Sequence, residues 1–169
     1  KKGINSVYTF LAYDAYSCDN EKTVALNILS SIIGGGMDSR LFNSLREDLG
    51  LVYSVSCSSH SWQCSGVFSV MAIHSKENCD DVIDAINKEL SFVLEKGITQ
   101  EELDTAKNQA KAWTYSHHES SNSMLSDKVY STLLNEIGMS NFIRILNSIT
   151  VDDINAVAKE ILNKSYSKL

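Results

Sequence analysis

Proline is absent from this 169-residue sequence, although an average protein contains about 5% proline. Proline-rich linkers are therefore excluded, and we find no internal repeat or low-complexity tract. No apolar run approaches the ~20 residues that span a bilayer, so no membrane-spanning segment is expected. The sequence predicts a single domain over residues 1–169.

Clusters of basic residues are also missing. The chain has 15 Lys and Arg against 21 Asp and Glu, which gives a net charge of −6. Because binding to a phosphate backbone requires grouped lysine and arginine side chains, no nucleic-acid partner is expected.

The four cysteines form no CxxC pair and do not have zinc-finger spacing. This pattern favours unpaired thiols in a reducing compartment, although Cys57 and Cys64 flank a predicted hairpin and a disulfide there stays open. With no visible targeting signal, the thiols favour a cytoplasmic location. The first residue is Lys1 rather than methionine, so we expect a fragment of a longer chain, whose missing part could carry a signal.

Several catalytic motifs are lacking as well. There is no GxSxG nucleophile elbow and no HExxH or HxxEH zinc motif. The three glycines at 34–36 follow a predicted helix and have no lysine behind them, unlike a phosphate-binding loop. No catalytic residue and no cofactor is therefore expected within this chain.

The SHHESS segment at 116–121 is the one place rich in metal-ligand residue types. On a helix, adjacent residues point about 100° apart, so His117, His118 and Glu119 cannot all face one ion. They are interpreted as solvated side chains at a helix end, and no metal site is expected. Surface carboxylates such as Glu102 are likewise interpreted as a solvated helix face.

The apolar pattern is strand-like at the start of the chain. The segment 4–13, rich in β-branched and aromatic residues, predicts a strand buried on both faces. Residues 21–33 have helical spacing, and the glycines at 34–36 are expected to end that helix in the left-handed conformation. A shorter helix follows, with Asp38 or Ser39 as its cap.

Two alternating segments, 51–59 and 67–75, predict a β-hairpin after a helix stop at Gly50. Capping boxes are expected where Thr99 is followed by Glu102 and where Thr150 is followed by Asp153. Helical periodicity dominates the second half, with helices predicted at 82–94, 103–113, 122–136, 139–147 and from 150 onward. This order favours an α+β domain with a mostly antiparallel sheet and helices packed on one face.

Arg46 and Tyr53 stand seven positions apart, one near the end of the short helix and one on the next strand. A cation at a helix C-terminus is favourable on its own, so Arg46 can be an ordinary surface residue. Alternatively, a guanidinium and a phenol together can donate hydrogen bonds to peptide carbonyls or to an oxyanion.

GGGMDSRLF followed by LREDLGLVYSV resembles the second-domain signature of the pitrilysin/insulinase-type zinc metallopeptidases, which include mitochondrial processing peptidase. The similarity continues through GITQEELDTAKNQ and ITVDDINAVAKEIL, so it covers nearly the whole chain. Members of this family are built from α+β domains that close around a chamber. One domain carries HxxEH and binds zinc, whereas this sequence resembles the partner type, the inactive peptidase domain.

The resemblance implies roles for Arg46 and Tyr53: hydrogen bonds to the substrate backbone and stabilisation of the oxyanion. Gly34, Gly35 and Gly36 correspond to a substrate-proximal segment in some members, or they simply turn the chain. The implied partners are a catalytic domain or subunit carrying HxxEH and zinc, an extended peptide substrate, and a possible second copy of this chain. The alternative is a non-catalytic assembly module, because the family also includes core subunits of a respiratory complex.

Overall fold

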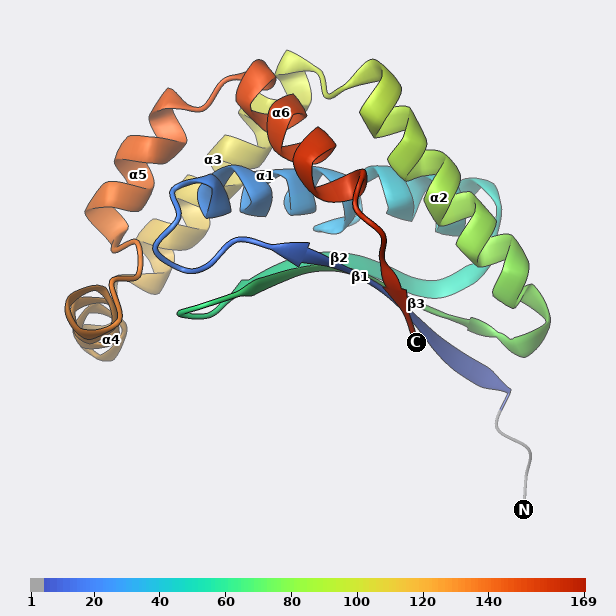
Figure 1. Ribbon diagram of the computed structural model, residues 1–169, viewed down its shortest axis with the longest axis horizontal. Helices are drawn as coiled ribbons and strands as arrows, with labels where there is room; N and C mark the ends of the chain where they lie inside the picture. The colour runs from blue at the N-terminus through green and yellow to red at the C-terminus, as the bar shows by residue number, and fades with distance from the viewer. Residues whose placement is uncertain (1–4) are drawn as a thin grey trace.

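The computed structural model describes residues 5–169, and Figure 1 shows helices arched over one curved sheet. The elements are, in chain order, β1 (Ser6–Ala15), α1 (Lys22–Gly34), η1 (Phe42–Asp48), β2 (Val52–Ser61), β3 (Gly66–Ser75), η2 (Lys76–Asn78), α2 (Cys79–Lys96), α3 (Gln100–His117), α4 (Ser121–Leu133), α5 (Met139–Ser148), α6 (Val151–Leu162) and β4 (Ser167–Lys168). The predicted α+β class is confirmed.

The sheet has the strand order β2-β3-β1-β4, and every neighbouring pair is antiparallel. The predicted hairpin is confirmed as β2 and β3, which pair from Ser61 opposite Gly66 down to Val52 opposite His74. The helices lie on one side of this sheet, as Figure 1 shows. Strand β2 forms one edge of the sheet. At the other edge β4 pairs with only Leu11 and Ala12, so most of β1 has no further strand beside it among the described residues.

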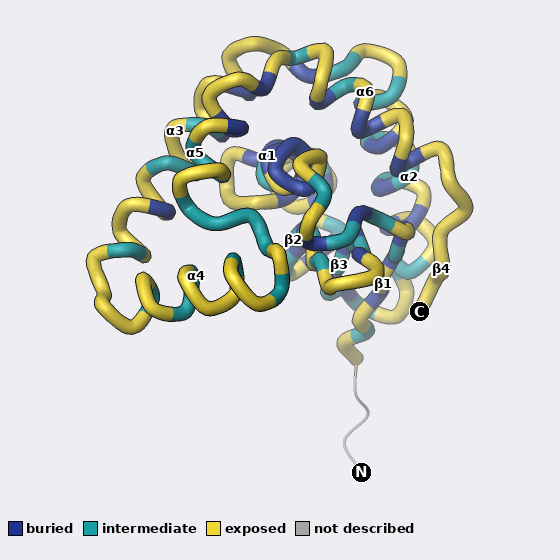
Figure 2. The backbone as a smooth tube through the Cα atoms, turned by 60° about the vertical axis from the view of Figure 1, so that its left-hand side comes forward, coloured by how far each residue is buried: buried dark blue, intermediate teal, exposed yellow. Residues whose placement is uncertain are grey.

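The hydrophobic core lies between the sheet and the helices. Helix α1 runs through its middle, and Figure 2 shows this helix as largely buried. The sheet contributes alternate residues, and the fully buried apolar ones on β1 and β3 are Leu11, Phe68, Val70 and Ala72. Each Å² of buried apolar surface contributes about 25 cal/mol, so the helix-covered face of the sheet is the main source of stability.

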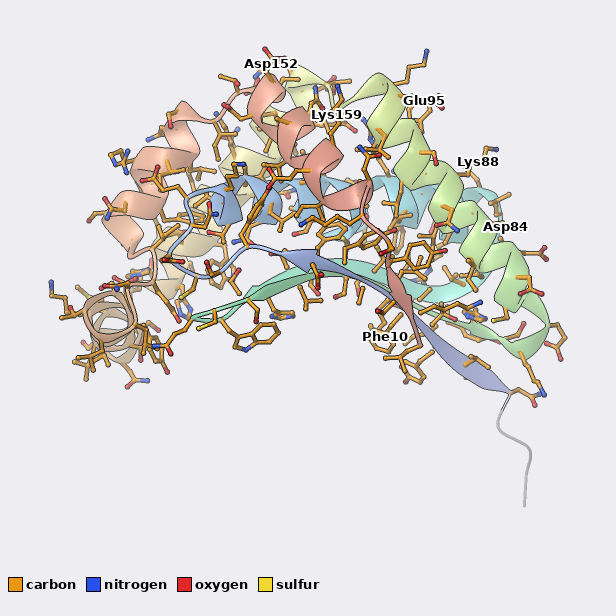
Figure 3. All side chains as sticks on the ribbon, viewed as in Figure 1. Phe10, Asp84, Lys88, Glu95, Asp152 and Lys159 are labelled. Atoms are coloured by element: carbon orange, nitrogen blue, oxygen red, sulfur yellow. The ribbon has the colours of Figure 1, made fainter. Side chains whose placement is uncertain are left out.

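The opposite face of the sheet is not covered, which corrects one prediction. The sequence predicts a strand buried on both faces here, but on β1 Tyr8 is 58% and Phe10 36% exposed. Figure 3 shows Phe10 pointing away from the helices. An apolar run has no alternation from which to infer an exposed face, so this side could not be recognised. Ile4, the first residue of the predicted strand, lies outside the described residues.

Helix ends were predicted well where the signal is local. Both capping boxes are confirmed, with Thr99 accepting from the Glu102 amide and Thr150 from the Asp153 amide. Among the described glycines, however, a positive φ occurs at Gly50 (61°) and Gly97 (73°) rather than in the triple glycine. Helix α1 ends at Gly34 with Gly35 at φ −85°, so the expectation of a left-handed stop there is wrong.

Helix α4 projects from the rest of the molecule at the left of Figure 1. None of its residues is buried, and Met124, Leu125 and Leu133 are more than half exposed. On α3, Leu103 and Ala106 are buried in the core, whereas Trp113 is 68% exposed. Within residues 5–169, no helix combines the length and apolarity needed to cross a bilayer.

Candidate functional site

Arg46 lies on the segment that connects α1 to β2. Leu41 and Leu45 anchor this segment, because both side chains are fully buried in the core. Arg46 itself is exposed, and its Cζ atom lies 5.0 Å from the centroid of the Phe42 ring. This cation–π contact holds the guanidinium against the protein while leaving its donors available to a ligand.

The short helix predicted here is present, but η1 is a π-helix. The amide of Leu49 donates to the carbonyl of Ser44 at 3.1 Å, five residues back. The predicted side-chain cap is not formed: the Ser39 hydroxyl instead donates to the carbonyl of Gly36 at 2.6 Å. π-helical turns are rare and occur frequently at functional sites, which singles out the segment carrying Arg46.

Tyr53 lies at an irregularity in the β2–β3 ladder. Val52 pairs with His74 and Ser54 with Ile73, so Tyr53 is the extra residue of a β-bulge. Both Val52 and Val55 face the core, whereas Tyr53 is 59% exposed. Bulges re-aim side chains and are common next to active sites.

The structure brings the two predicted site segments together. The amide of Leu51 donates to the carbonyl of Leu45 at 2.9 Å, which joins the residue before Arg46 to the residue two before Tyr53. The turn between them is made by Gly50 in the left-handed conformation. Neither Arg46 nor Tyr53 is in the packed interior.

A buried polar pair beneath the bulge was not predicted. His74, which pairs with Val52, is 0% exposed. Its Nδ1 lies 2.7 Å from the carbonyl of Ser75, which can only accept, so Nδ1 carries the hydrogen. Its Nε2 then accepts from the hydroxyl of Thr9 at 2.8 Å. The pair joins β1 to β3 at the ladder position opposite Val52, where the bulge begins.

The three glycines occupy different environments. Gly34 is buried, and a Cβ atom on it would lie 2.6 Å from both the Cβ and the backbone nitrogen of Cys57. Gly35 and Gly36 are exposed and line a cleft of about 430 Å³ against the first turns of α3. Of the three glycines, Gly35 and Gly36 line that cleft and Gly34 does not. A substrate-proximal role for the segment stays a prediction.

Arg40 and Glu102 form an ion pair at this cleft. Arg40 donates from Nε and Nη2 to the two carboxylate oxygens at 2.6 and 2.7 Å, and from Nη2 to the carbonyl of Gly97 at 3.0 Å. Burial alone would raise the pKa of Glu102, but the bonds from Arg40 and Thr99 outweigh it and hold that pKa below its usual value. The interpretation of Glu102 as simply solvated is therefore wrong.

No group of three or more His, Cys, Asp or Glu residues within 5–169 is placed to hold a metal ion. His117 stacks on Trp113 with ring centroids 4.9 Å apart, and His118 lies 2.9 Å from the carbonyl of Thr114 through Nδ1. The His118 side chain is only 15% exposed, so it is not the solvated residue that the sequence suggested.

This chain is similar in sequence to one protein family and to several curated proteins. The profile of the family described as the peptidase M16 inactive domain matches residues 1–110. The uncharacterized zinc protease YmxG of Bacillus subtilis is 28% identical over 169 residues, 99% of this chain and 41% of that protein. The uncharacterized zinc protease ML0855 of Mycobacterium leprae is 35% identical over 144 residues, 84% of this chain and 32% of that protein.

Solved structures share the fold. A protease from Helicobacter pylori superposes with a TM-score of 0.90 at 24% identity, over 99% of this chain and 41% of that chain. A peptidase M16 inactive domain from Pseudomonas fluorescens gives 0.85 at 23% identity, over 98% and 40%. An inactive peptidase domain from Bordetella parapertussis gives 0.81 at 14% identity, over 100% of this chain and 94% of that chain.

The chain thus spans about two fifths of the length of the Bacillus subtilis relative. The family profile covers the glycine segment, η1, the β2–β3 hairpin and both members of the Arg40–Glu102 pair. The chain belongs to the family of peptidase M16 inactive domains.

Proposed function

We propose that this chain is the substrate-binding domain of a zinc-dependent endopeptidase. In the full-length protein, Arg46 and Tyr53 would face a peptide held at a zinc site on another domain or subunit. The family membership and the relatives named zinc proteases support this proposal. Since the described residues offer no metal-binding group, this domain alone is expected not to cleave peptides.

The observation that carries the proposal is the backbone geometry around the pair. A π-helix presents an exposed guanidinium, a β-bulge presents an exposed phenol, and one backbone hydrogen bond joins the two segments. Both irregularities are local departures from standard structure of the kind that accompany functional sites. The chemistry that these donors can provide is hydrogen bonding to substrate carbonyls and to a developing oxyanion.

The sheet itself supports an extended peptide as the ligand. Strand β2 is at the edge of the sheet and pairs only with β3 among the described strands. Its outward N–H and C=O groups are therefore available to add a peptide as a further strand. Tyr53 lies at one end of this edge, where it could reach such a peptide.

The test uses the full-length protein together with its catalytic domain or subunit. Arg46→Ala and Tyr53→Phe should each lower kcat/KM for an unfolded peptide by roughly 10²–10³-fold, as expected for the loss of one oxyanion donor. Arg144→Ala and Tyr115→Phe serve as matched controls, because both side chains are exposed on other elements and should leave kcat/KM unchanged.

Unchanged kcat/KM in both Arg46→Ala and Tyr53→Phe would refute the assigned roles. Equal losses in the control variants would show that the effect is not specific to this pair.

A second candidate is a non-catalytic assembly module, which is favoured by the apolar side chains that α4 exposes. A chain in Complex III2 from Candida albicans has the same fold, with a TM-score of 0.84 at 18% identity over 99% of this chain. A full-length sequence and genomic neighbour without HxxEH, with no chelator-sensitive peptidase activity, would favour this candidate over the first.

A further inference from the structure

We propose that Arg40 is a positioning residue, which fixes the start of η1 and thereby the place of the Arg46 guanidinium. This inference rests on the proposed function, because it assigns Arg40 a role in presenting Arg46 to substrate. Arg40 lies directly between the glycine segment and η1, at the point where the chain leaves the cleft. Its side chain is 15% exposed, and it reaches across to the junction between α2 and α3.

The acceptor of Arg40 is itself held rigidly. The Glu102 carboxylate accepts two bonds from Arg40 and two more from Thr99, through the Thr99 amide at 2.7 Å and hydroxyl at 3.0 Å. The adjacent Ile98 amide donates to Asn155 of α6 at 3.0 Å. The Arg40 guanidinium therefore binds the junction between α2 and α3, which α6 also contacts. A bidentate pair fixes the orientation of the guanidinium as well as its distance from the carboxylate.

The route from Arg40 to Arg46 is short and packed. Leu41 follows Arg40 and is fully buried, and Phe42 comes next and supplies the ring on which Arg46 rests. The Arg40 guanidinium also lies over the ring of Phe92, with Cζ 5.6 Å from the ring centroid. A shift at Arg40 would therefore move the Phe42 platform, and a displacement of about 1 Å can cost a rate of order 10²-fold.

Stability alone does not account for this arrangement. Arg40 Nη1 is buried without a hydrogen-bond partner, and a buried unsatisfied donor is unfavourable. Partly buried ion pairs also lose much of their attraction to desolvation. What the Arg40–Glu102 pair supplies is a fixed geometry, in contrast to the Arg144–Glu21 pair, whose side chains are 61% and 64% exposed.

The first experiment is a mutant cycle in the full-length protein with its catalytic partner. Arg40→Lys keeps the charge but loses the fork, and it should lower kcat/KM by about tenfold, mostly through kcat. In the Arg46→Ala background, Arg40→Lys should have no further effect, because Arg40 acts through Arg46. Arg144→Ala is the matched control.

The second experiment needs no activity and uses the 169-residue chain. The Phe42 ring should shift the NMR resonance of the Arg46 Nε–Hε group, and Phe42→Leu shows how large this shift is, because it removes the ring. Arg40→Lys should move the Arg46 resonance toward its position in Phe42→Leu, well below the unfolding temperature, while Arg144→Ala leaves it in place. A purely structural role for Arg40 would lower Tm without moving this resonance.

The outcomes separate the two proposals. An unmoved Arg46 resonance, or additive losses of kcat/KM in the Arg40→Lys/Arg46→Ala double variant, would overturn the role of Arg40. A wild-type full-length protein without peptidase activity would instead remove the proposed function, and the NMR result would still decide whether Arg40 positions Arg46.

Discussion

The two faces of the sheet are built from the same strands and have opposite properties. On the helix-covered face, Leu11, Phe68 and Val70 are 0% exposed. On the other face, Tyr8 and Tyr53 are 58% and 59% exposed. Because strand side chains alternate between faces, neighbours in sequence serve different purposes.

This difference separates residues that specify the fold from residues that are free to act. The covered face must match α1 in shape, and any change there alters core packing. The uncovered face carries apolar residues on β1 and β3, with serines at 54, 56 and 58 on β2. The uncovered face has no such packing constraint within this domain. The bulge presents Tyr53 on this face.

The largest expected effect contrasts one phenylalanine on each face. Phe68→Ala should lower the free energy of unfolding by about 3–5 kcal/mol, because it leaves a cavity in the core. Phe10→Ala, 36% exposed on the uncovered face, should cost less than about 1 kcal/mol. Urea unfolding of both variants measures the difference. Similar losses would mean that the second face is also packed in solution.

Features set by local sequence were predicted, whereas those set by distant contacts were not. The two capping boxes and the helix stop at Gly50 need only a few adjacent residues, and all are confirmed. The hairpin followed from period-two alternation in two neighbouring segments. These signals survive in the fold because nothing distant competes with them.

The backbone structure around the candidate site could be predicted only in part, for the same reason. The sequence singles out Arg46 and Tyr53. It does not predict the π-helix and the bulge that present them, because both depend on how the segment between α1 and β2 packs against the core. Arg40 and Glu102 are 62 positions apart, so no local pattern could pair them. The uncovered face was missed because exposure depends on which elements are absent above a strand.

A smaller effect should distinguish the glycines. Gly34→Ala places a Cβ atom 2.6 Å from the Cβ and nitrogen of Cys57, where α1 packs on β2. We expect a loss of roughly 2–3 kcal/mol by overpacking. Gly36→Ala is the matched control, because nothing lies within 4 Å of its added Cβ and its φ is not positive.

The Gly34→Ala and Gly36→Ala pair is compared by thermal and urea unfolding. A Gly36→Ala variant that is as destabilised as Gly34→Ala would show that the segment is held in a conformation that only glycine adopts. A tolerated Gly34→Ala would mean that α1 can shift away from β2 at no cost.

The smallest expected effect concerns pH and lies at the edge of the helix layer. Because the folded-state pKa of Glu102 is lowered, its contribution to stability is present above the unfolded-state value and is lost as pH falls through the folded-state value. Glu102→Gln should cost about 1.5 kcal/mol at pH 7, the worth of a hydrogen bond to a charged group. The difference in the free energy of unfolding between Glu102→Gln and wild type should narrow below pH 4.5, since a protonated glutamate resembles glutamine.

Urea unfolding between pH 7 and pH 3 measures this difference, with the exposed Glu95→Gln as control (Figure 3). A difference that stays constant across this range would show that the Glu102 charge does not stabilise the junction.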